Sequence, residues 1–227
     1  MIKNIIIAGG SGNLGRFLIE KYSNLGYMVY NLSRSKPKKI HKNEIFLKCN
    51  LSIYKDVCKS IKKIKANSIN LIVCCAGNSR KDYKDIVKDE NFINAFSDNF
   101  LSFSNLVEAY LELFKKKKTS IIAISSIAAN KVINAPIPYS VAKSALNHYC
   151  KIKAKEISKF KINLNIISPG NIFMNENNWG LKKKNDPNKI KKYIKNNVPL
   201  NSFIFPDQIF DLCNYISKNR KNLTGSN

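Results

Sequence analysis

The stretch NIIIAGGSGNLG (residues 4–15) decides the fold of this chain. A short β-rich run (4–9) passes directly into a glycine-rich loop, and the residues after the loop have a helical pattern. Gly10 to Gly15 fit the spacing G-x-G-x-x-G, in which glycines permit a tight turn and let the backbone approach a pyrophosphate at the positive end of a helix. The hexapeptide alone is also compatible with a turn that binds nothing. Its place between a strand and a helix favours a dinucleotide site.

Six β-rich runs alternate with helical patterns along the chain. They cover residues 4–9, 27–33, 44–51, 69–77, 119–126 and 162–170. Most are continuously apolar, which is typical of parallel strands covered by helices on both faces. We therefore predict an α/β protein with a doubly wound parallel sheet, a Rossmann fold, built as a single domain over residues 1–227.

Composition argues against several classes of protein. The net charge is +24, but lysine outnumbers arginine 35 to 4 and the charges are spread along the chain, as in a composition bias rather than a nucleic-acid-binding patch. No apolar run approaches the roughly 20 residues of a membrane-spanning helix, and the first apolar run is too short for a signal peptide. The six cysteines lack the spacing of a metal site. We expect a cytoplasmic protein with no nucleic-acid, membrane or metal partner.

The end of the second predicted strand indicates which dinucleotide binds. Sites for NAD typically place an Asp or Glu about 20 residues after the glycine loop, where it holds the ribose hydroxyls. No acidic residue lies between Tyr27 and Asn43, and the chain has Ser33, Arg34 and Lys36 there instead. A guanidinium suits a 2′-phosphate, which it can bind through two hydrogen bonds. We therefore predict NADP(H) in preference to NAD(H).

The stretch PYSVAKSAL (138–146) carries a second signal. On a helix, Tyr139 and Lys143 are four residues apart and share one face. Ser126 ends the predicted strand 119–126, and active sites of open α/β sheets lie at the carboxyl ends of strands. A cationic neighbour favours the phenolate and lowers the pKa of a tyrosine, so the pair suits proton transfer near neutral pH. A surface tyrosine and lysine on an ordinary helix are the alternative.

Ser126, Tyr139 thirteen residues later and Lys143 together resemble the signature of the short-chain dehydrogenase/reductase family. The resemblance covers essentially the whole chain, because the glycine loop, CCAG (74–77), SPG (168–170) and VPLNSF (198–203) also occur in family order. It implies that Tyr139 is the general acid/base, that Lys143 also binds the nicotinamide ribose, and that Ser126 donates a hydrogen bond to the substrate oxygen.

A helix predicted over residues 91–114 supplies a fourth candidate. Its aromatic and aliphatic stripe recurs every three or four residues. Asn99 lies at the edge of this stripe, where a buried amide must find a partner. The family resemblance implies that Asn99 positions a water in a proton relay to the lysine. An amide that only bridges to the backbone is the alternative.

The resemblance also implies the residues that contact the cofactor. They are Gly9, Ser11, Gly12, Asn13, Leu14, Ser33, Arg34, Asn50, Leu51, Ala76, Gly77, Tyr139, Lys143, Pro169, Gly170 and Ile172. Several positions depart from the family pattern. Asn13 replaces a loop glycine, and we expect it to tolerate a left-handed backbone. CCAG replaces the usual NNAG, and the sequence stops where the family's final strand would begin, so this strand is expected to be missing.

Residues 171–200 correspond to the family's substrate lid. Its Trp179 could form the wall of a substrate pocket or anchor the lid on its own domain. We expect a small carbonyl or alcohol substrate, of 3-oxoacyl or sugar type, and a homodimer or homotetramer. The alternatives are a sugar-nucleotide epimerase or dehydratase of related fold and a non-catalytic NADP-binding regulator.

Overall fold

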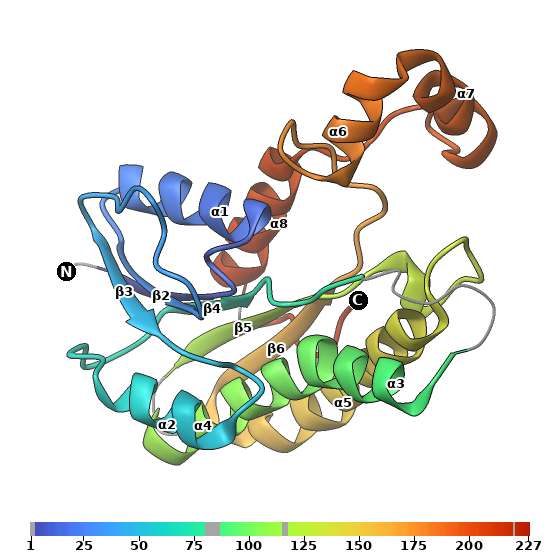
Figure 1. Ribbon diagram of the computed structural model, residues 1–227. Coiled ribbons are helices and arrows are strands. Elements are labelled where there is room, and N and C mark those ends of the chain that lie inside the picture. The colour runs from blue at the N-terminus through green and yellow to red at the C-terminus, as the bar shows by residue number, and fades with distance from the viewer. Residues whose placement is uncertain (1–2, 80–86, 115–117, 220) are drawn as a thin grey trace.

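The computed structural model describes residues 3–79, 87–114, 118–219 and 221–227, and these residues form the predicted sheet (Figure 1). Six strands pair in parallel in the order β3-β2-β1-β4-β5-β6. The strands are β1 (Asn4–Ala8), β2 (Met28–Ser33), β3 (Glu44–Lys48), β4 (Leu71–Cys74), β5 (Thr119–Ile124) and β6 (Ile162–Ile167). The doubly wound parallel fold is confirmed.

Helices cover both faces of the sheet, as Figure 1 shows. One face carries α1 (Asn13–Asn24) and α8 (Pro206–Lys218), and the other carries α2 (Tyr54–Lys62), α4 (Ser102–Phe114) and α5 (Ile137–Ile157). The remaining helical elements are α3 (Asp89–Phe96), the π-helical turn η1 (Ser97–Leu101), the short 3₁₀ turns η2 (Ile127–Ala129) and η3 (Ser158–Phe160), α6 (Asn178–Asn185) and α7 (Pro187–Asn197).

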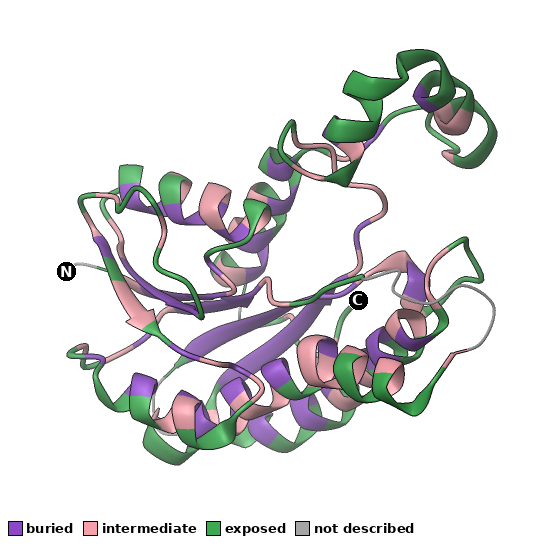
Figure 2. Ribbon diagram, in the orientation of Figure 1, coloured by how far each residue is buried: buried purple, intermediate pink, exposed green. Residues whose placement is uncertain are grey.

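Alternate residues of β1, β2, β4 and β5 enter two separate hydrophobic cores. In β1, Ile5 and Ile7 pack with α1 and α8, whereas Ile6 and Ala8 pack with α2, α4 and α5. All four residues are fully buried. Figure 2 shows the strands largely buried, except for the edge strand β3. Burying one such isoleucine stabilises the fold by about 1.5–3 kcal/mol, so the continuous apolar runs hold the sheet between its two helical layers.

Several strands end earlier than the sequence predicts. β4 stops at Cys74 rather than at residue 77, β5 stops at Ile124, and β6 stops at Ile167. The residues beyond these ends form loops at the carboxyl edge of the sheet. The strand order reverses between β1 and β4, and in open α/β sheets ligands bind at such a crossover.

The last residues of the chain, 223–227, run along the outer edge of β6. The amide of Gly225 donates to the carbonyl of Leu164, and the amide of Ile166 donates to the carbonyl of Ser226, both at 2.8 Å. These residues are not assigned to a strand, so the sheet of the described residues has six strands. No helix among the described residues is long and apolar enough to cross a membrane.

Candidate active site

The glycine turn between β1 and α1 brings two strand ends into contact. Gly9 has a φ of +81°, which favours glycine, and a Cβ there would lie 2.7 Å from the backbone nitrogen of Ala76 after β4. The Gly12 amide donates to the carbonyl of Gly9 at 3.1 Å. Asn13 is the first residue of α1 and its φ is not positive. The tolerance of Asn13 for a left-handed backbone is therefore not called on, because the residue has helical geometry.

A cleft opens at the carboxyl ends of β1, β2, β3 and β4. Predicted cofactor residues that line it are Gly9, Ser11, Gly12, Ser33, Arg34, Asn50, Leu51, Ala76 and Gly77. Predicted residues outside this lining are Asn13, Leu14, Tyr139, Lys143, Pro169, Gly170 and Ile172. Lining residues that sequence reasoning missed are Cys49, Ser52, Cys75, Asn78, Ser97, Asp98 and Ser102. Most of the missed residues are chain neighbours of predicted ones.

The guanidinium of Arg34 lies exposed at the rim of the cleft. The side chain of Arg34 is 63% exposed, and its Nη1 lies 4.0 Å from Oδ1 of Asp98 on η1. Glu44 is the first acidic residue after β2, and its buried carboxylate binds Arg16 of α1. Glu44 therefore cannot take the place of the missing ribose carboxylate, and sequence reasoning gave no sign of its ion pair.

Asn99 is buried in the π-helical turn η1 that interrupts the predicted helix 91–114. Its Nδ2 donates to the carbonyls of Asn78 at 2.9 Å and Ala95 at 3.0 Å, and its Oδ1 accepts from the amide of Asn78 at 3.0 Å. π-Helical turns are frequent at functional sites. Here the turn directs the side-chain amide of Asn99 toward the loop that follows β4.

Lys143 projects from α5 into the same region and is buried. Its Nζ donates to the carbonyl of Ile124 at the end of β5, at 2.9 Å. A Cβ on Gly77 would lie 2.7 Å from Oδ1 of Asn99 and 3.1 Å from Nζ of Lys143. Glycine at this position therefore leaves room for both side chains. Burial lowers the pKa of Lys143 to about 8, since the charged amine has left water.

Tyr139 and Ser126 complete the cluster. Nζ of Lys143 lies 5.8 Å from the centre of the Tyr139 ring. Burial raises the pKa of Tyr139, and interaction with the nearby Ser126 side chain only partly offsets this. The expectation that the lysine lowers the tyrosine pKa does not hold in this structure, because burial is the dominant effect.

The structure thus brings Asn99, Ser126, Tyr139 and Lys143 together beside the cleft. A family model described as enoyl-(acyl carrier protein) reductase matches residues 28–227. The chain belongs to the short-chain dehydrogenase/reductase family. Members of this family are oxidoreductases that work with a nicotinamide cofactor, so the protein is an enzyme of this class.

Relatives of known function are similar over most of their length. A 3-oxoacyl-(acyl-carrier-protein) reductase of Bos taurus is 26% identical over 212 residues, covering 89% of this chain and 86% of the relative. A reductase of the same name from Buchnera aphidicola is 25% identical, covering 96% and 91%. A sorbose reductase of Candida albicans is 26% identical, covering 97% and 83%.

Solved structures agree in fold. ElxO with NADP bound superposes with a TM-score of 0.89 at 20% identity, covering 100% of this chain and 96% of ElxO. A short-chain dehydrogenase of Leptospira borgpetersenii with bound NAD+ gives a TM-score of 0.85 at 23% identity, covering 100% and 90%. Both cofactors therefore occur on this fold, and the likeness does not distinguish between them.

Aromatic rings of this short-chain dehydrogenase/reductase pack together in residues 171–200 and the residues just after them. Trp179 packs against Tyr193 at 4.8 Å and Phe203 at 5.0 Å between ring centres. Nζ of Lys182 lies 4.7 Å from the centre of the Trp179 ring. These contacts lie within the segment and its immediate continuation, so both interpretations of Trp179 stay predictions.

Proposed function

We propose that this protein is an NADP(H)-dependent oxidoreductase that interconverts a carbonyl and an alcohol, with Tyr139 as the general acid/base. The observation that carries the proposal is the cluster in which half-buried Tyr139 lies near half-buried Ser126 and one helical turn from buried Lys143. A phenol, a hydroxyl and an amine at the carboxyl edge of a parallel sheet match the needs of carbonyl reduction.

The residues of the cleft fit a dinucleotide. Gly9 and Gly12 bring the backbone close to a ligand, and the amino end of α1 favours a pyrophosphate. Leu51 and Ala76 would contact the adenosine, and the loop after β6, from Pro169 to Ile172, would contact the nicotinamide amide. The nicotinamide, when bound, supplies the hydride in reduction and accepts it in oxidation.

Proton transfer would fall to the side chains of this cluster. Because burial raises the pKa of Tyr139, its phenol is protonated at neutral pH and can donate to an oxygen that gains negative charge. Ser126 would donate a hydrogen bond to the same oxygen. Lys143 would bind the nicotinamide ribose and stabilise negative charge on the phenol, and Asn99 would position a water beside the lysine.

NADP(H) is proposed over NAD(H) because of the groups available at the end of β2. Arg34 is exposed at the cleft, whereas Glu44 is occupied by Arg16. A bidentate guanidinium–phosphate contact contributes more than a neutral hydrogen bond. We expect Arg34→Ala to weaken NADPH binding more than NADH binding.

The substrate is proposed to be a small carbonyl or alcohol compound of 3-oxoacyl or sugar type. The similar proteins include reductases of 3-oxoacyl groups on acyl carrier protein and a sorbose reductase. Residues 171–200 are proposed as the lid over this substrate. A cytoplasmic homodimer or homotetramer stays a prediction, and an epimerase or a dehydratase of related fold is the alternative function.

Tyr139→Phe tests the proposal. We expect at least a 10²–10⁴-fold loss of NADPH-dependent carbonyl reduction, because the general acid is removed, with NADPH affinity by fluorescence titration changed less than about threefold. Tyr215→Phe, on an exposed ring of α8, is the matched control. Undiminished turnover in Tyr139→Phe would refute the acid/base role, and failure of the unaltered protein to bind either dinucleotide would refute the proposed function.

A further inference from the structure

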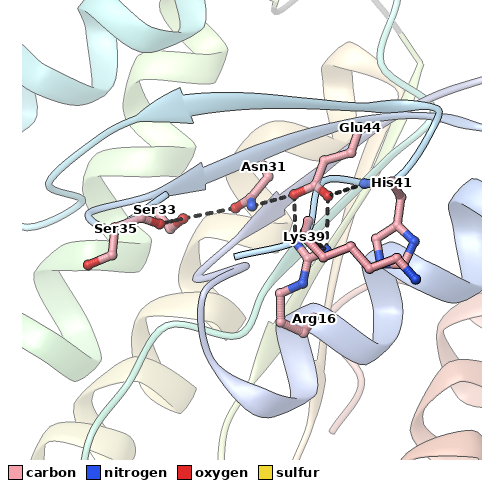
Figure 3. A network of polar contacts seen from close by, with 7 residues as sticks. All are labelled: Arg16, Asn31, Ser33, Ser35, Lys39, His41 and Glu44. Atoms are coloured by element: carbon pink, nitrogen blue, oxygen red, sulfur yellow. Dashed lines mark hydrogen bonds and ion pairs between the residues drawn. The ribbon is translucent and has the colours of Figure 1, made fainter. Parts of the chain in front are cut away.

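A buried network beneath the glycine turn links α1, β2 and β3, as Figure 3 shows. The Glu44 carboxylate at its centre is completely buried and accepts from four donors. The donors are Nη1 of Arg16 at 2.6 Å, Nη2 of Arg16 at 3.0 Å, Nδ2 of Asn31 at 2.7 Å and the amide of His41 at 3.0 Å. Burial raises the pKa of Glu44, but these donors outweigh it and the net shift is downward, so the group is an anion that only accepts.

The carboxylate fixes the orientation of the Asn31 amide. Because Glu44 has no proton to donate, the Asn31 group that faces it must be the NH₂ group, and the Asn31 carbonyl oxygen points the other way. This oxygen lies directly beneath the glycine turn, 2.2 Å from where a Cβ on Gly10 would be. It accepts a hydrogen bond from the hydroxyl of Ser33 at 3.0 Å.

The hydroxyl of Ser33 therefore donates its proton to an acceptor within the protein. Its hydroxyl has a single proton, and two internal acceptors compete for it, namely Oδ1 of Asn31 and the carbonyl of Ser35 at 3.3 Å. Ser33 is buried and also lines the cofactor cleft next to Arg34. What remains for a ligand is the oxygen of Ser33 and its lone pairs, because the proton is used within the protein.

We infer that Ser33 serves the bound dinucleotide only as a hydrogen-bond acceptor, and that buried Glu44, acting through Asn31, is the positioning residue that sets this polarity. The inference rests on the proposed function. An acceptor suits a ribose hydroxyl, which NADH and NADPH both carry, and does not suit a 2′-phosphate, which has only acceptor oxygens. Discrimination between the two cofactors is left to the guanidinium of Arg34.

Ser33→Ala separates this inference from the usual expectation that a serine beside an arginine binds the phosphate. We expect Ser33→Ala to weaken NADPH and NADH by the same factor, about 3–10-fold, as for the loss of one hydrogen bond. Arg34→Ala, measured alongside, is expected to weaken NADPH alone. The matched control is Ser35→Ala, whose exposed side chain stands outside the network.

Glu44→Gln tests the origin of the polarity. In Glu44→Gln, the NH₂ group of the glutamine replaces one carboxylate oxygen and faces the same four donors. Of these donors, only the Asn31 side chain can turn its oxygen toward the glutamine, because a guanidinium and a backbone amide cannot accept. With Asn31 reversed, its NH₂ group donates to Ser33, and the carbonyl of Ser35 at 3.3 Å is the remaining internal acceptor for the hydroxyl proton. A charged 2′-phosphate is a stronger acceptor than this carbonyl and can take the proton. We expect the ratio of NADPH to NADH affinity to rise about 3–10-fold, and Ser33→Ala in the same background to abolish this rise.

Fluorescence titration with NADPH and NADH measures the cofactor affinities of the Ser33→Ala and Glu44→Gln variants. Glu20→Gln, on the exposed side of α1, is the control for Glu44→Gln. A selective loss of NADPH in Ser33→Ala, or a ratio that stays constant or falls in Glu44→Gln, overturns the inference while both cofactors still bind. If the unaltered protein binds neither dinucleotide, the proposed function fails as well. Should Glu44→Gln not fold, the comparison of Ser33→Ala with Arg34→Ala still decides the matter.

Discussion

The proposed catalytic cluster and the proposed lid are built in opposite ways. Asn99 and Lys143 are 1% and 3% exposed, and both are tied to backbone groups at the ends of strands β4 and β5. In residues 171–200, all described by the structure, only Gly180 and Ile190 are buried, and Ile172 forms an isolated bridge with Ile204 outside the sheet. Figure 2 shows the contrast between the buried strands and the exposed α6 and α7.

The difference is one of packing, because the cluster lies on well-packed elements and residues 171–200 have few buried contacts. Groups that must meet within hydrogen-bond distance are carried by elements whose positions two hydrophobic cores determine. The lid is held by a few ring contacts, and segments with few buried apolar contacts open most easily. Changes in the cluster should therefore alter chemistry and stability, whereas changes in the lid should alter substrate binding alone.

Lys143→Met is expected to have the largest effect of the changes that test this contrast. It removes the amine beside Tyr139 while keeping much of the side-chain volume, and we expect turnover to fall about 10²–10⁴-fold. Single-turnover reduction with NADPH measures the loss. Lys151→Met, on the exposed side of the same helix, is the control. A rate within a factor of three of the unaltered enzyme would remove Lys143 from the mechanism.

The same variant should stabilise the fold at neutral pH. Burial lowers the pKa of Lys143 from 10.5 to about 8, so holding the charged amine in the fold costs about 3 kcal/mol below pH 8. This cost disappears as the pH rises from about 8 to about 10.5, where the unfolded chain also loses the proton. Urea unfolding should thus find Lys143→Met more stable by up to about 3 kcal/mol near pH 7, with the gain shrinking towards pH 10.5.

A gain in stability that is equal at both pH values would contradict this account of Lys143. It would mean that packing, and not the desolvated charge, limits the stability of the cluster. The lost hydrogen bond to Ile124 reduces the gain at every pH, so only the change with pH reports on the charge.

Trp179→Ala is expected to have the smallest effect and should leave the sheet intact. Removing the ring takes away the contacts to Tyr193 and Phe203, so we expect KM to rise about 3–10-fold with the free energy of unfolding changed by less than about 1 kcal/mol. Steady-state kinetics and urea unfolding measure the two quantities. Leu181→Ala, on an exposed residue of α6, is the control. A large loss of global stability would show that the lid is part of the core.

Much of the fold could be predicted from the sequence because its signals are local. The apolar runs of β1 to β6 and the glycine turn after β1 predict a parallel sheet with a dinucleotide crossover, and the observed strand order agrees. The spacing of Tyr139 and Lys143 places both on one face of α5. Asn99 was selected on the edge of the aromatic stripe, although the π-helical turn that directs it inward has no signal in the sequence.

Two properties were decided only by the tertiary structure. The sequence contains Arg16, Asn31 and Glu44 without any spacing that joins them, and only the packing of α1 against β2 and β3 forms their network. Burial raises the pKa of Tyr139, whereas its lysine neighbour alone would lower it. The physical reason is that helix and strand periodicity is encoded residue by residue, whereas desolvation and hydrogen-bond direction depend on which distant segments surround a group after folding.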